Sequence, residues 1–417
     1  MYVCGPTVYD LPHIGHGRQT LVYDTLRRYL EWSGLEVEHV SNITDVDDNI
    51  INRAADRGRS TDDVVAEYEA AWYEAMDALG VLRPTHDPHA SAYIERMVEL
   101  VGELMERGLA YEISDGVHLD TGQVEGYGLL ALQPLDQLRS GARVGVDAEK
   151  RSPLDFVLWK KAKPGEPTWD SPWGAGRPGW HTECVVMSLD LLGEGFDLHA
   201  GGMDLRFPHH ENERAQAVAL GRRFSQHWMH HGFVEVAGEK MSKSLGNYTS
   251  LTDLLGRSDA RAYRLLVLRS HYRSPMEVTP DTMAQAEASM RRLDDFARSF
   301  ASTSDSSPRA EALTLFRDAM EDDFDTPRAV ALLFTLVNEA HADGSLDAAS
   351  AALEIARALG FELAGADALD AATERLVADR DAARRDRDFA RADALRDELV
   401  ALGWVVEDTA EGTRVHR

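Results

Sequence analysis

The first motif with the residues for chemistry lies near the N-terminus, where two histidines enclose an isoleucine and a glycine: His13-Ile14-Gly15-His16. The motif precedes a long helical pattern, and the backbone amides at a helix N-terminus favour phosphate. Gly15 lets a ligand lie against the backbone, and the imidazoles of His13 and His16 can donate hydrogen bonds to triphosphate oxygens as charge develops. Taken alone, this spacing is more typical of ordinary surface or core histidines.

A second motif, Lys240-Met241-Ser242-Lys243-Ser244, combines two lysines and two hydroxyls within five residues. Lysine is a flexible point charge, so Lys240 and Lys243 can follow phosphate groups as they separate, which suits a pyrophosphate leaving group. Alone, a short basic loop is more often solvated surface. The two motifs together favour the phosphate interpretation of both.

Histidines are concentrated between residues 181 and 231, which contain seven of the 16 in the chain. His209 and Glu213 are four residues apart, so a helix places them on one face with a usual metal-ligand spacing. The two cysteines, Cys4 and Cys184, can complete a four-ligand site that zinc accepts. The competing interpretation is that both cysteines are small buried hydrophobes and that His209 and Glu213 pair with each other. Spacing alone leaves both open.

The elements expected around these motifs begin with a strand over residues 2–4, a helix over 17–33 and a strand over 37–40. This order opens a βαβ unit and predicts a parallel sheet. The loop-rich stretch 112–150 is interpreted as an insertion, and a polar segment over 301–308 as a linker before a helical region. Further helices are expected over residues 61–79, 91–107, 310–320, 326–342, 346–359 and 388–402, and a short strand over 404–406.

The composition excludes several classes of protein. The 417 residues are 44% hydrophobic and 28% charged, which is ordinary for a globular chain of about two to four domains. No run of about 18 apolar residues exists that would span a membrane, and the first residues do not form a signal peptide. Two cysteines cannot form a disulfide framework, so a reducing, cytoplasmic location is expected.

The formal net charge of −27 is unevenly distributed along the chain. Residues 139–163 contain seven Lys/Arg and three acidic residues, and residues 375–417 contain nine basic and ten acidic residues. A polyanion can therefore bind locally, despite the repulsion expected from the total charge. A solvated acidic surface accounts equally well for the bulk of the excess.

Six motifs, taken in order along the chain, resemble those of the cysteinyl-tRNA synthetase family, which belongs to the class I aminoacyl-tRNA synthetases. The resemblance runs nearly from end to end and includes both cysteines and the tail over 388–399. The matching segments are residues 2–10, 13–16, 42–48, 176–184, 207–213 and 240–247.

The resemblance implies an α/β fold, in which a Rossmann-type parallel-sheet catalytic domain with an insertion is followed by a mainly α-helical anticodon-binding domain. The parts that it implies are a catalytic domain over 1–245 with its insertion at about 95–150, a stem-contact region over 246–300, a helical anticodon-binding domain over 309–374 and a small C-terminal tRNA-binding subdomain over 375–417.

The implied activity is the ligation of cysteine to tRNA in two steps. The carboxylate of L-cysteine attacks the α-phosphate of ATP, giving cysteinyl-adenylate and pyrophosphate, and the terminal adenosine of tRNA(Cys) then takes the cysteinyl group. Positioning and charge neutralisation dominate such chemistry. The resemblance places His13 and His16 on the triphosphate and Lys240 and Lys243 on the departing phosphates, with Mg²⁺ accompanying ATP. It also implies a monomer.

By the same resemblance, Cys4, Cys184, His209 and Glu213 bind one zinc ion. A soft metal prefers a thiolate to a hydroxyl and lowers the pKa of a thiol, so substrate cysteine can bind the metal through sulfur, whereas serine offers a poor ligand. That discrimination makes a separate editing site unnecessary. Four further residues, each explained equally well by packing, match family positions in or near the amino-acid pocket: Thr44, Trp180, His181 and His199.

The chain departs from the family pattern at Ala200, which replaces a glycine and adds a methyl group where a positive φ is expected. Two alternative functions are weighed. The related mycothiol-pathway cysteine ligase makes the same adenylate but passes cysteine to an amino-sugar, and Glu213 and the long helical C-terminal region argue against it. A non-catalytic synthetase paralogue that binds tRNA or senses cysteine is disfavoured by the intact phosphate motifs and the four candidate ligands.

Overall fold

Two compact units make up the described part of the chain. The computed structural model describes residues 1–131, 149–236, 239–240, 249–301, 306–364, 371–409 and 412–416. The first unit holds residues 1–287, 317–330 and 358–360, and the second holds residues 288–316, 331–357 and 361–417.

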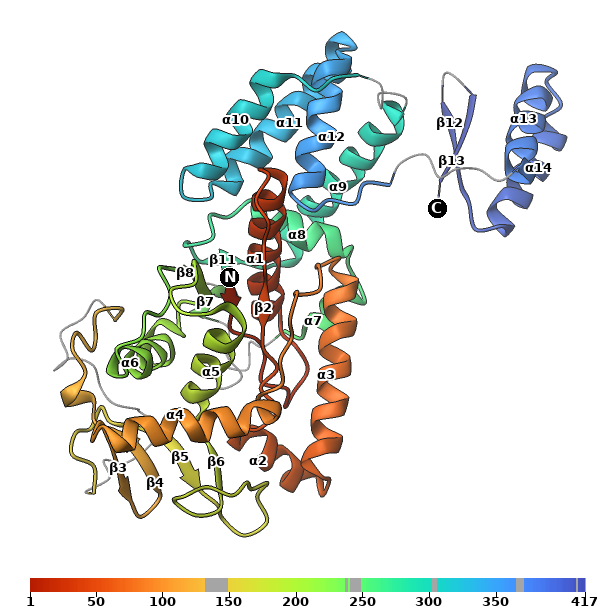
Figure 1. Cartoon of the computed structure of the whole chain (residues 1–417). Coiled ribbons are helices and arrows are strands. Elements are labelled where there is room, and N and C mark those ends of the chain that lie inside the picture. The colour runs from red at the N-terminus through yellow and green to blue at the C-terminus, as the bar shows by residue number, and fades with distance from the viewer. Residues whose placement is uncertain are drawn as a thin grey trace. The chain divides into compact units, whose positions relative to one another are not determined.

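A four-stranded parallel sheet is the framework of the first unit (Figure 1). Its strand order is β2-β1-β7-β8, and Tyr2 of β1 pairs with Val40 on one side and His199 on the other. The expected βαβ opening and parallel sheet are therefore confirmed. The second strand begins at Val40 rather than at residue 37, because the carbonyl of His39 accepts hydrogen bonds from the backbone of Thr85 and His86 instead of joining the ladder. The strands are β1 (Tyr2–Val3), β2 (Val40–Ser41), β7 (Leu198–Gly202) and β8 (His227–His231).

The helix α1 (Ile14–Trp32) connects the first two strands. Its residue Arg18 is fully buried, and the guanidinium donates hydrogen bonds to the backbone carbonyls of Phe233 at 2.7 Å, Tyr272 at 3.1 Å and Ser274 at 2.5 Å. Burial lowers the pKa of Arg18 to about 10, so the side chain stays charged at neutral pH. One buried cation therefore ties α1 to two distant backbone segments.

A second sheet, which is antiparallel, is formed by the strands β3 to β6 in chain order. A Cβ atom on Gly116 would lie 2.0 Å from the carbonyl oxygen of Trp159, so β4 approaches β5 too closely for any residue but glycine. The stretch interpreted as loop from residue 112 thus begins with a hairpin, while residues 132–148 lie outside the described part. The strands are β3 (Ala110–Ile113), β4 (Gly116–Leu119), β5 (Phe156–Lys161) and β6 (Gly176–Pro178).

One hydrophobic core joins both sheets to the helix α4 (Ile94–Glu106). The apolar residues of α4 recur at helical spacing and are buried against the core, as the sequence pattern predicts. The expected helix over 91–107 is divided, because a 3₁₀ turn (Ala90–Tyr93) precedes α4. Cys4 and Cys184 belong to this same core, with 4% and 1% of their surface exposed.

The other described elements of the first unit include the helices that carry the site residues and a small sheet of order β10-β9-β11. No helix among the described residues has the length and apolar character needed to cross a membrane. The elements are α2 (Asp48–Arg57), α3 (Thr61–Ala78), α5 (Trp180–Leu192), α6 (Glu211–Ala219), α7 (Leu251–Leu255), α8 (Ala260–Leu268), β9 (Val234–Val236), β10 (Glu239–Lys240) and β11 (Met276–Glu277).

The buried His39 makes acid stability a testable property of the fold. Neither ring nitrogen has a hydrogen-bond partner among the described residues, and burial lowers the pKa of His39 to about 3. His39 is therefore protonated in the unfolded chain at a pH where it stays neutral in the native state, so the free energy of unfolding decreases as pH falls below about 6.5. Between pH 6.5 and pH 5, protonation of His39 in the unfolded chain should cost the unmodified protein about 2 kcal/mol of unfolding free energy. We expect His39→Phe to abolish this loss.

The measurement is urea unfolding at several pH values, with the exposed His227 changed to asparagine as the control. The control should keep the pH dependence of the unmodified protein. Equal slopes of stability against pH in the His39→Phe variant and the unmodified protein would show that His39 is not the group responsible.

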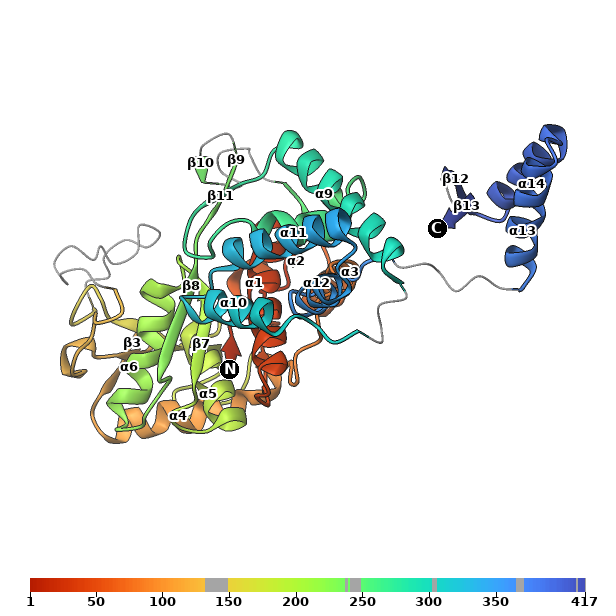
Figure 2. The same cartoon turned by 90° about the horizontal axis from the view of Figure 1, so that it is seen from above.

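The helical region expected after residue 308 is confirmed. Figure 2 shows α10, α11 and α12 beside one another, as does Figure 1. In the second unit, Arg309 bonds to Glu339 at 2.6 Å and to Asp347 at 3.0 Å, which links these helices through one side chain. In the predicted linker, residues 302–305 lie outside the described part. The helices are α9 (Pro280–Ser299), α10 (Ala310–Glu321), α11 (Thr326–Asp343) and α12 (Leu346–Ala358).

The C-terminal stretch folds as two helices and a hairpin around a small core of its own. Leu399, Trp404, Val406 and Val415 form that core. The helix expected over 388–402 and the strand that follows are present with boundaries shifted by a few residues, whereas the preceding helix and the last strand were not predicted. The elements are α13 (Ala371–Arg385), α14 (Phe389–Ala401), β12 (Val405–Thr409) and β13 (Gly412–His416).

Candidate active site

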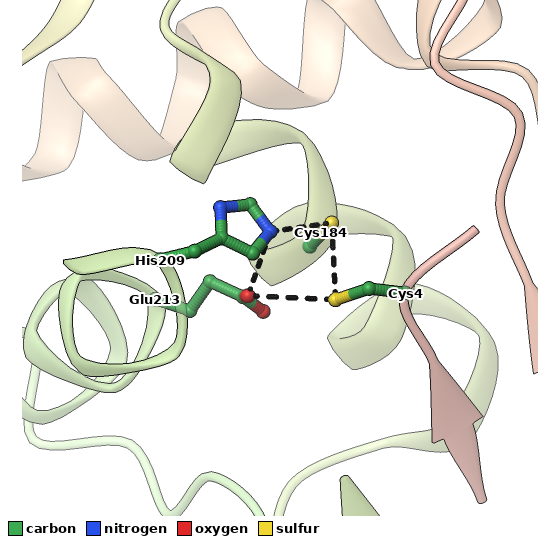
Figure 3. Close-up of side chains that lie close together, drawn as sticks. All are labelled: Cys4, Cys184, His209 and Glu213. Atoms are coloured by element: carbon green, nitrogen blue, oxygen red, sulfur yellow. Dashed lines mark hydrogen bonds and ion pairs between the residues drawn. The ribbon is translucent and has the colours of Figure 1, made fainter. Parts of the chain in front are cut away.

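Four side chains from three separate segments meet at the carboxyl end of β1 (Figure 3). The Sγ atoms of Cys4 and Cys184 are 4.0 Å apart, and the Sγ of Cys4 lies 3.8 Å from Glu213 Oε1. His209 Nε2 lies 3.5 Å from the Sγ of Cys184 and 3.1 Å from Glu213 Oε1. The ligand atoms of all four lie within 4.8 Å of one another, so one ion can contact them together.

The backbone around Cys4 explains why this residue reaches the centre. Its N–H donates to the carbonyl of Ala200 at 3.1 Å, which continues the pairing of β1 with β7. A Cβ atom on the next residue, Gly5, would lie only 1.6 Å from the carbonyl oxygen of Asn42, so glycine is required there. Ala200 lies within β7 and does not have a positive φ, so the expectation of a positive φ at this position is wrong.

The helical segment of His209 and Glu213 starts at a sharp boundary. Phe207 has an extended conformation, with φ −143° and ψ 133°, and the residues from Pro208 onward turn into α6. Pro208 follows the extended Phe207 directly, and proline is well suited to the first position of a helical segment. His209 and Glu213 consequently point in the same direction from one helix face, as their spacing predicts.

A second group of side chains also has a spacing that suits a metal ion: Cys4, His199, His210 and Glu213. It shares Cys4 and Glu213 with the first group. His210 Nε2 lies 3.3 Å from the Sγ of Cys4, and its Nδ1 lies 2.9 Å from His230 Nε2. The sequence analysis did not predict that His210 belongs to a group with metal-ligand spacing. Its position next to His209 in the sequence was the one indication available.

The expected amino-acid-pocket residues surround this centre. The ring of Trp180 stacks on that of His209 with centroids 3.9 Å apart, and His181 Nδ1 lies 2.8 Å from His209 Nδ1. His199 Nε2 lies 2.7 Å from Glu213 Oε2. His181 thus contacts the Nδ1 of His209, and His199 contacts the Oε2 of Glu213. In each case the other polar atom of the candidate ligand faces the centre.

Burial determines which protonation states the side chains of this centre favour. Burial raises the pKa of the Cys4 thiol and of the Glu213 carboxyl and lowers the pKa of His209. Without a cation, desolvation therefore favours neutral side chains. A bound divalent cation reverses this preference for the thiol and the carboxyl, because its charge stabilises their ionised forms. The two sulfur, one nitrogen and one oxygen donors fit zinc.

The two motif histidines form a reciprocal cap at the start of α1. His13 Nδ1 accepts from the backbone N–H of His16 at 3.1 Å, and His16 Nδ1 accepts from the backbone N–H of His13 at 3.2 Å. Their rings stack with centroids 3.6 Å apart. Because both Nδ1 atoms act as acceptors, each neutral ring carries its proton on Nε2, which is a donor. The sequence pattern did not reveal this cap.

The described residues before and after the second motif are hydrogen-bonded to α1 and to the loop that precedes it, respectively. Before it, the carbonyl of Phe233 accepts from Arg18, and β9 begins directly afterwards. After it, the backbone of Leu251 donates to Pro12 at 2.8 Å, next to the His13 cap. Lys243 lies outside the described residues, and of Lys240 only the backbone in β10 is described. Gly15 lies in the first turn of α1.

Thr44 lies near the candidate metal centre in a chain of buried hydrogen bonds. Its hydroxyl donates to Glu183 Oε2 at 3.0 Å and accepts from Asn42 Nδ2 at 3.1 Å. The Sγ of Cys184 is 3.8 Å from Asn42 Oδ1. Burial raises the pKa of Glu183. Asn42 and Glu183 were not singled out from the sequence, although both lie within its matched motifs.

Three family comparisons cover most of the chain. The family of class I (C) tRNA synthetase catalytic domains matches residues 1–288. A DALR domain matches residues 315–365, and a cysteinyl-tRNA ligase anticodon-binding domain matches residues 366–416.

Curated relatives match along nearly their whole length. The cysteine–tRNA ligase of Halorhodospira halophila is 46% identical over 435 residues, which covers 100% of this chain and 94% of the relative. Cysteine–tRNA ligase 1 of Photobacterium profundum is 45% identical over 439 residues, covering 100% and 95%.

Solved structures with low sequence identity share the fold. Mycobacterium tuberculosis methionyl-tRNA synthetase in complex with methionyl-adenylate has a TM-score of 0.56 at 15% identity, covering 86% of this chain and 89% of that one. The Agrobacterium radiobacter K84 LeuRS–tRNA–LeuAMS complex has a TM-score of 0.64 at 12% identity, covering 86% and 83%. The catalytic-domain match and the full-length relatives show that the chain belongs to the cysteinyl-tRNA synthetase family of class I aminoacyl-tRNA synthetases.

Proposed function

We propose that the protein is a cysteine–tRNA ligase, which activates L-cysteine with ATP and transfers the cysteinyl group to the 3′ end of tRNA(Cys). The observation that carries the proposal is the convergence of Cys4, Cys184, His209 and Glu213, together with the cap formed by His13 and His16, which follows Cys4 in the chain. A thiol-selecting metal and a triphosphate-binding helix start are what cysteine activation requires. The curated names of the relatives support the same activity.

We propose zinc as the metal, held by Cys4, Cys184, His209 and Glu213. Two thiolates suit zinc better than the one thiolate of the alternative group with His199 and His210. The side chains around the ligands also support this set, because His181 bonds the Nδ1 of His209 and leaves its Nε2 facing the centre. When bound, zinc supplies a soft Lewis acid that takes the substrate's thiolate in preference to a hydroxyl.

The adjacent residues His209 and His210 provide a matched test of this ligand set. We expect His209→Gln to lose zinc, because the Nε2 that faces Cys184 and Glu213 disappears. His210→Gln should retain zinc at one ion per chain, since His210 does not belong to the proposed ligand set. Metal analysis after dialysis measures both variants. Loss of zinc from His210→Gln with retention in His209→Gln would assign the metal to the other group.

In the first step, the cysteine carboxylate oxygen attacks the α-phosphorus of ATP, and the bond to the bridging oxygen breaks as pyrophosphate leaves. We assign His13 and His16 to the triphosphate, because their capped geometry places the Nε2 protons as donors. Lys243, and with it Lys240, neutralises the departing phosphates, and Mg²⁺ accompanies ATP. Gly15 allows the nucleotide to approach the backbone of α1.

The cysteine pocket is proposed to lie between the candidate metal centre and Thr44. Trp180, His181 and His199 contact the ligand side chains directly, so they can shape the pocket and orient the ligands at once. In the second step, a hydroxyl of the terminal adenosine of tRNA attacks the acyl carbon and AMP leaves. The anticodon-binding match over 366–416 supports tRNA as the acceptor. The division into catalytic, stem-contact and anticodon-binding parts, the monomeric state and the cytoplasmic location remain predictions.

Cysteine-dependent exchange of labelled pyrophosphate into ATP tests the activation step. We expect exchange with L-cysteine and none above background with L-serine at equal concentration. Exchange without tRNA charging would indicate that an amino-sugar accepts the cysteinyl group, as in the mycothiol-pathway alternative. Absence of exchange from zinc-loaded protein would favour the non-catalytic paralogue and overturn the proposal.

A further inference from the structure

Glu183 has a buried carboxyl group that neither the candidate metal site nor the phosphate motifs use. It lies on α5 directly before Cys184, and only 1% of its surface is exposed. Among the described residues no lysine or arginine forms an ion pair with it, and its hydrogen bond comes from the Thr44 hydroxyl at 3.0 Å. A buried carboxyl group with one hydrogen-bond partner among the described residues is costly to the fold, so its presence at this place calls for a functional reason.

The direction of each hydrogen bond in this network is fixed. The backbone N–H of Gly5, which can only donate, lies 2.9 Å from Asn42 Oδ1 and therefore sets the orientation of the Asn42 amide. The hydroxyl of Tyr2 donates to the same oxygen at 3.0 Å. The amide nitrogen of Asn42 must then face Thr44, and it donates to Thr44 Oγ1 at 3.1 Å.

The Thr44 hydroxyl has one bonding position left after these contacts. A hydroxyl offers one proton and two lone pairs. The proton is given to Glu183 Oε2, and one lone pair is taken by the Asn42 amide. The remaining lone pair can only accept, so a group bound there must be a donor. Thr44 is 1% exposed, which prevents water from rearranging this pattern freely.

We propose that Glu183 is a positioning residue, which holds the Thr44 hydroxyl as an acceptor for the α-ammonium group of substrate cysteine. An ammonium has three N–H donors and no acceptor, so it matches the remaining lone pair of Thr44. The bond that Thr44 donates to Glu183 also strengthens the hydroxyl oxygen as an acceptor, because hydrogen bonds in a chain polarise one another. This inference rests on the proposed function, since it requires the substrate thiol to bind the proposed metal. The network is next to that metal site, because the Sγ of Cys184 lies 3.8 Å from Asn42 Oδ1.

The consequence is a second criterion for substrate selection. A ligand must present both a thiol and an ammonium group, and a thiol acid without the amine should lose the Thr44 contact. If Glu183 were replaced by glutamine, its side-chain amide could donate to Thr44 and turn the hydroxyl proton toward the pocket. The hydroxyl proton would then face the N–H groups of an ammonium and repel them. The binding of a ligand without an amine would not change.

The test compares L-cysteine with 3-mercaptopropionate, which keeps the thiol and carboxylate and lacks the amine. Binding of both to the full-length, zinc-loaded protein is measured by titration calorimetry, with zinc content and melting temperature recorded for each variant. We expect Glu183→Gln to weaken cysteine binding about 10- to 100-fold, as for a hydrogen bond to a charged group. Binding of 3-mercaptopropionate and the zinc content should stay unchanged.

A double-mutant cycle assigns the effect to Thr44. Thr44→Val should show the same selective loss, Thr44→Ser should retain cysteine binding, and Glu183→Gln should add nothing further in the Thr44→Val background. Glu183→Met provides a second variant should the glutamine variant fold poorly, because an apolar side chain of similar length removes the cost of burying a polar group. A Glu183→Met protein as stable as the unmodified one but weakened for cysteine alone supports a positioning role.

Two results would overturn the inference and leave the proposed function standing. One is a parallel loss of binding for cysteine and 3-mercaptopropionate, and the other is unchanged cysteine binding in both Glu183 variants. Failure of the unmodified, zinc-loaded protein to bind cysteine would instead overturn the proposed function, and the inference with it.

Discussion

Replacing Cys184 with serine is expected to remove the zinc proposed for this site and the preference for cysteine over serine together. A serine hydroxyl is a poor ligand for zinc, and the remaining three side chains cannot complete the set around the ion. The affinity for zinc should fall by more than about 100-fold, because even changes outside the ligand shell cost about 10- to 100-fold. Metal analysis and pyrophosphate exchange with cysteine and with serine measure the two effects on the same preparation.

The matched control for this variant is Thr182→Ser, on the same helix. Thr182 is also fully buried, and its hydroxyl bonds to the carbonyl of Leu158 rather than facing the ligands. The control should keep one zinc per chain and full discrimination. Stoichiometric zinc in the Cys184→Ser protein would exclude Cys184 from the ligand set and favour the alternative group with His199 and His210.

Replacing Lys243 with alanine should slow adenylate formation by about 100- to 1,000-fold, the range found for a lost electrostatic contact to a transition state. The charge of the leaving pyrophosphate develops in the transition state, so cysteine affinity should hardly change. Rapid-quench measurement of adenylate formation gives the rate, and equilibrium binding of cysteine gives the affinity.

The exposed Lys163 changed to alanine serves as the control for charge, since it removes one lysine from a different segment. It should leave the rate within about twofold of the unmodified protein, as is usual for a surface substitution. A Lys243→Ala protein that forms the adenylate at the normal rate would remove Lys243 from the leaving-group role.

The sequence predicted those parts of the site that depend on local spacing. His209 and Glu213 share a helix face because they are four residues apart, and the structure places them 3.1 Å from each other. Spacing could not decide between His209 and its neighbour His210, because both rings reach the centre from one short segment. Nor could it supply the stacked cap of His13 and His16, which depends on backbone geometry at one helix start.

Contacts between distant segments could not be predicted from spacing, and the family resemblance alone brought Cys4 and Cys184 together with His209 and Glu213. The hydrogen bond from Thr44 to Glu183 joins residues 139 positions apart, and its direction depends on the orientation of the Asn42 amide. Sequence periodicity carries no information about such a network, although a buried threonine and glutamate within matched motifs were available as candidates.

For the fold, too, the sequence predicted the elements that depend on local spacing and missed those that depend on pairing between distant segments. Amphipathic helices such as α3 were predicted nearly to the residue, because their apolar spacing is local. The hairpin of β3 and β4 was interpreted as loop, since its strands are four residues each and its turn is polar and glycine-containing. Only the pairing of β4 with β5, across about forty residues, makes that hairpin part of a sheet.

The central claim is that this chain charges a tRNA with cysteine and rejects serine without an editing site. The most direct test is ATP-dependent charging of a tRNA that carries a cysteine-specific anticodon, with labelled cysteine and, separately, labelled serine. The account predicts acid-precipitable label with cysteine and none above background with serine. Charging with both amino acids would contradict selection by a thiol-preferring metal, and charging with neither would contradict the ligase function itself.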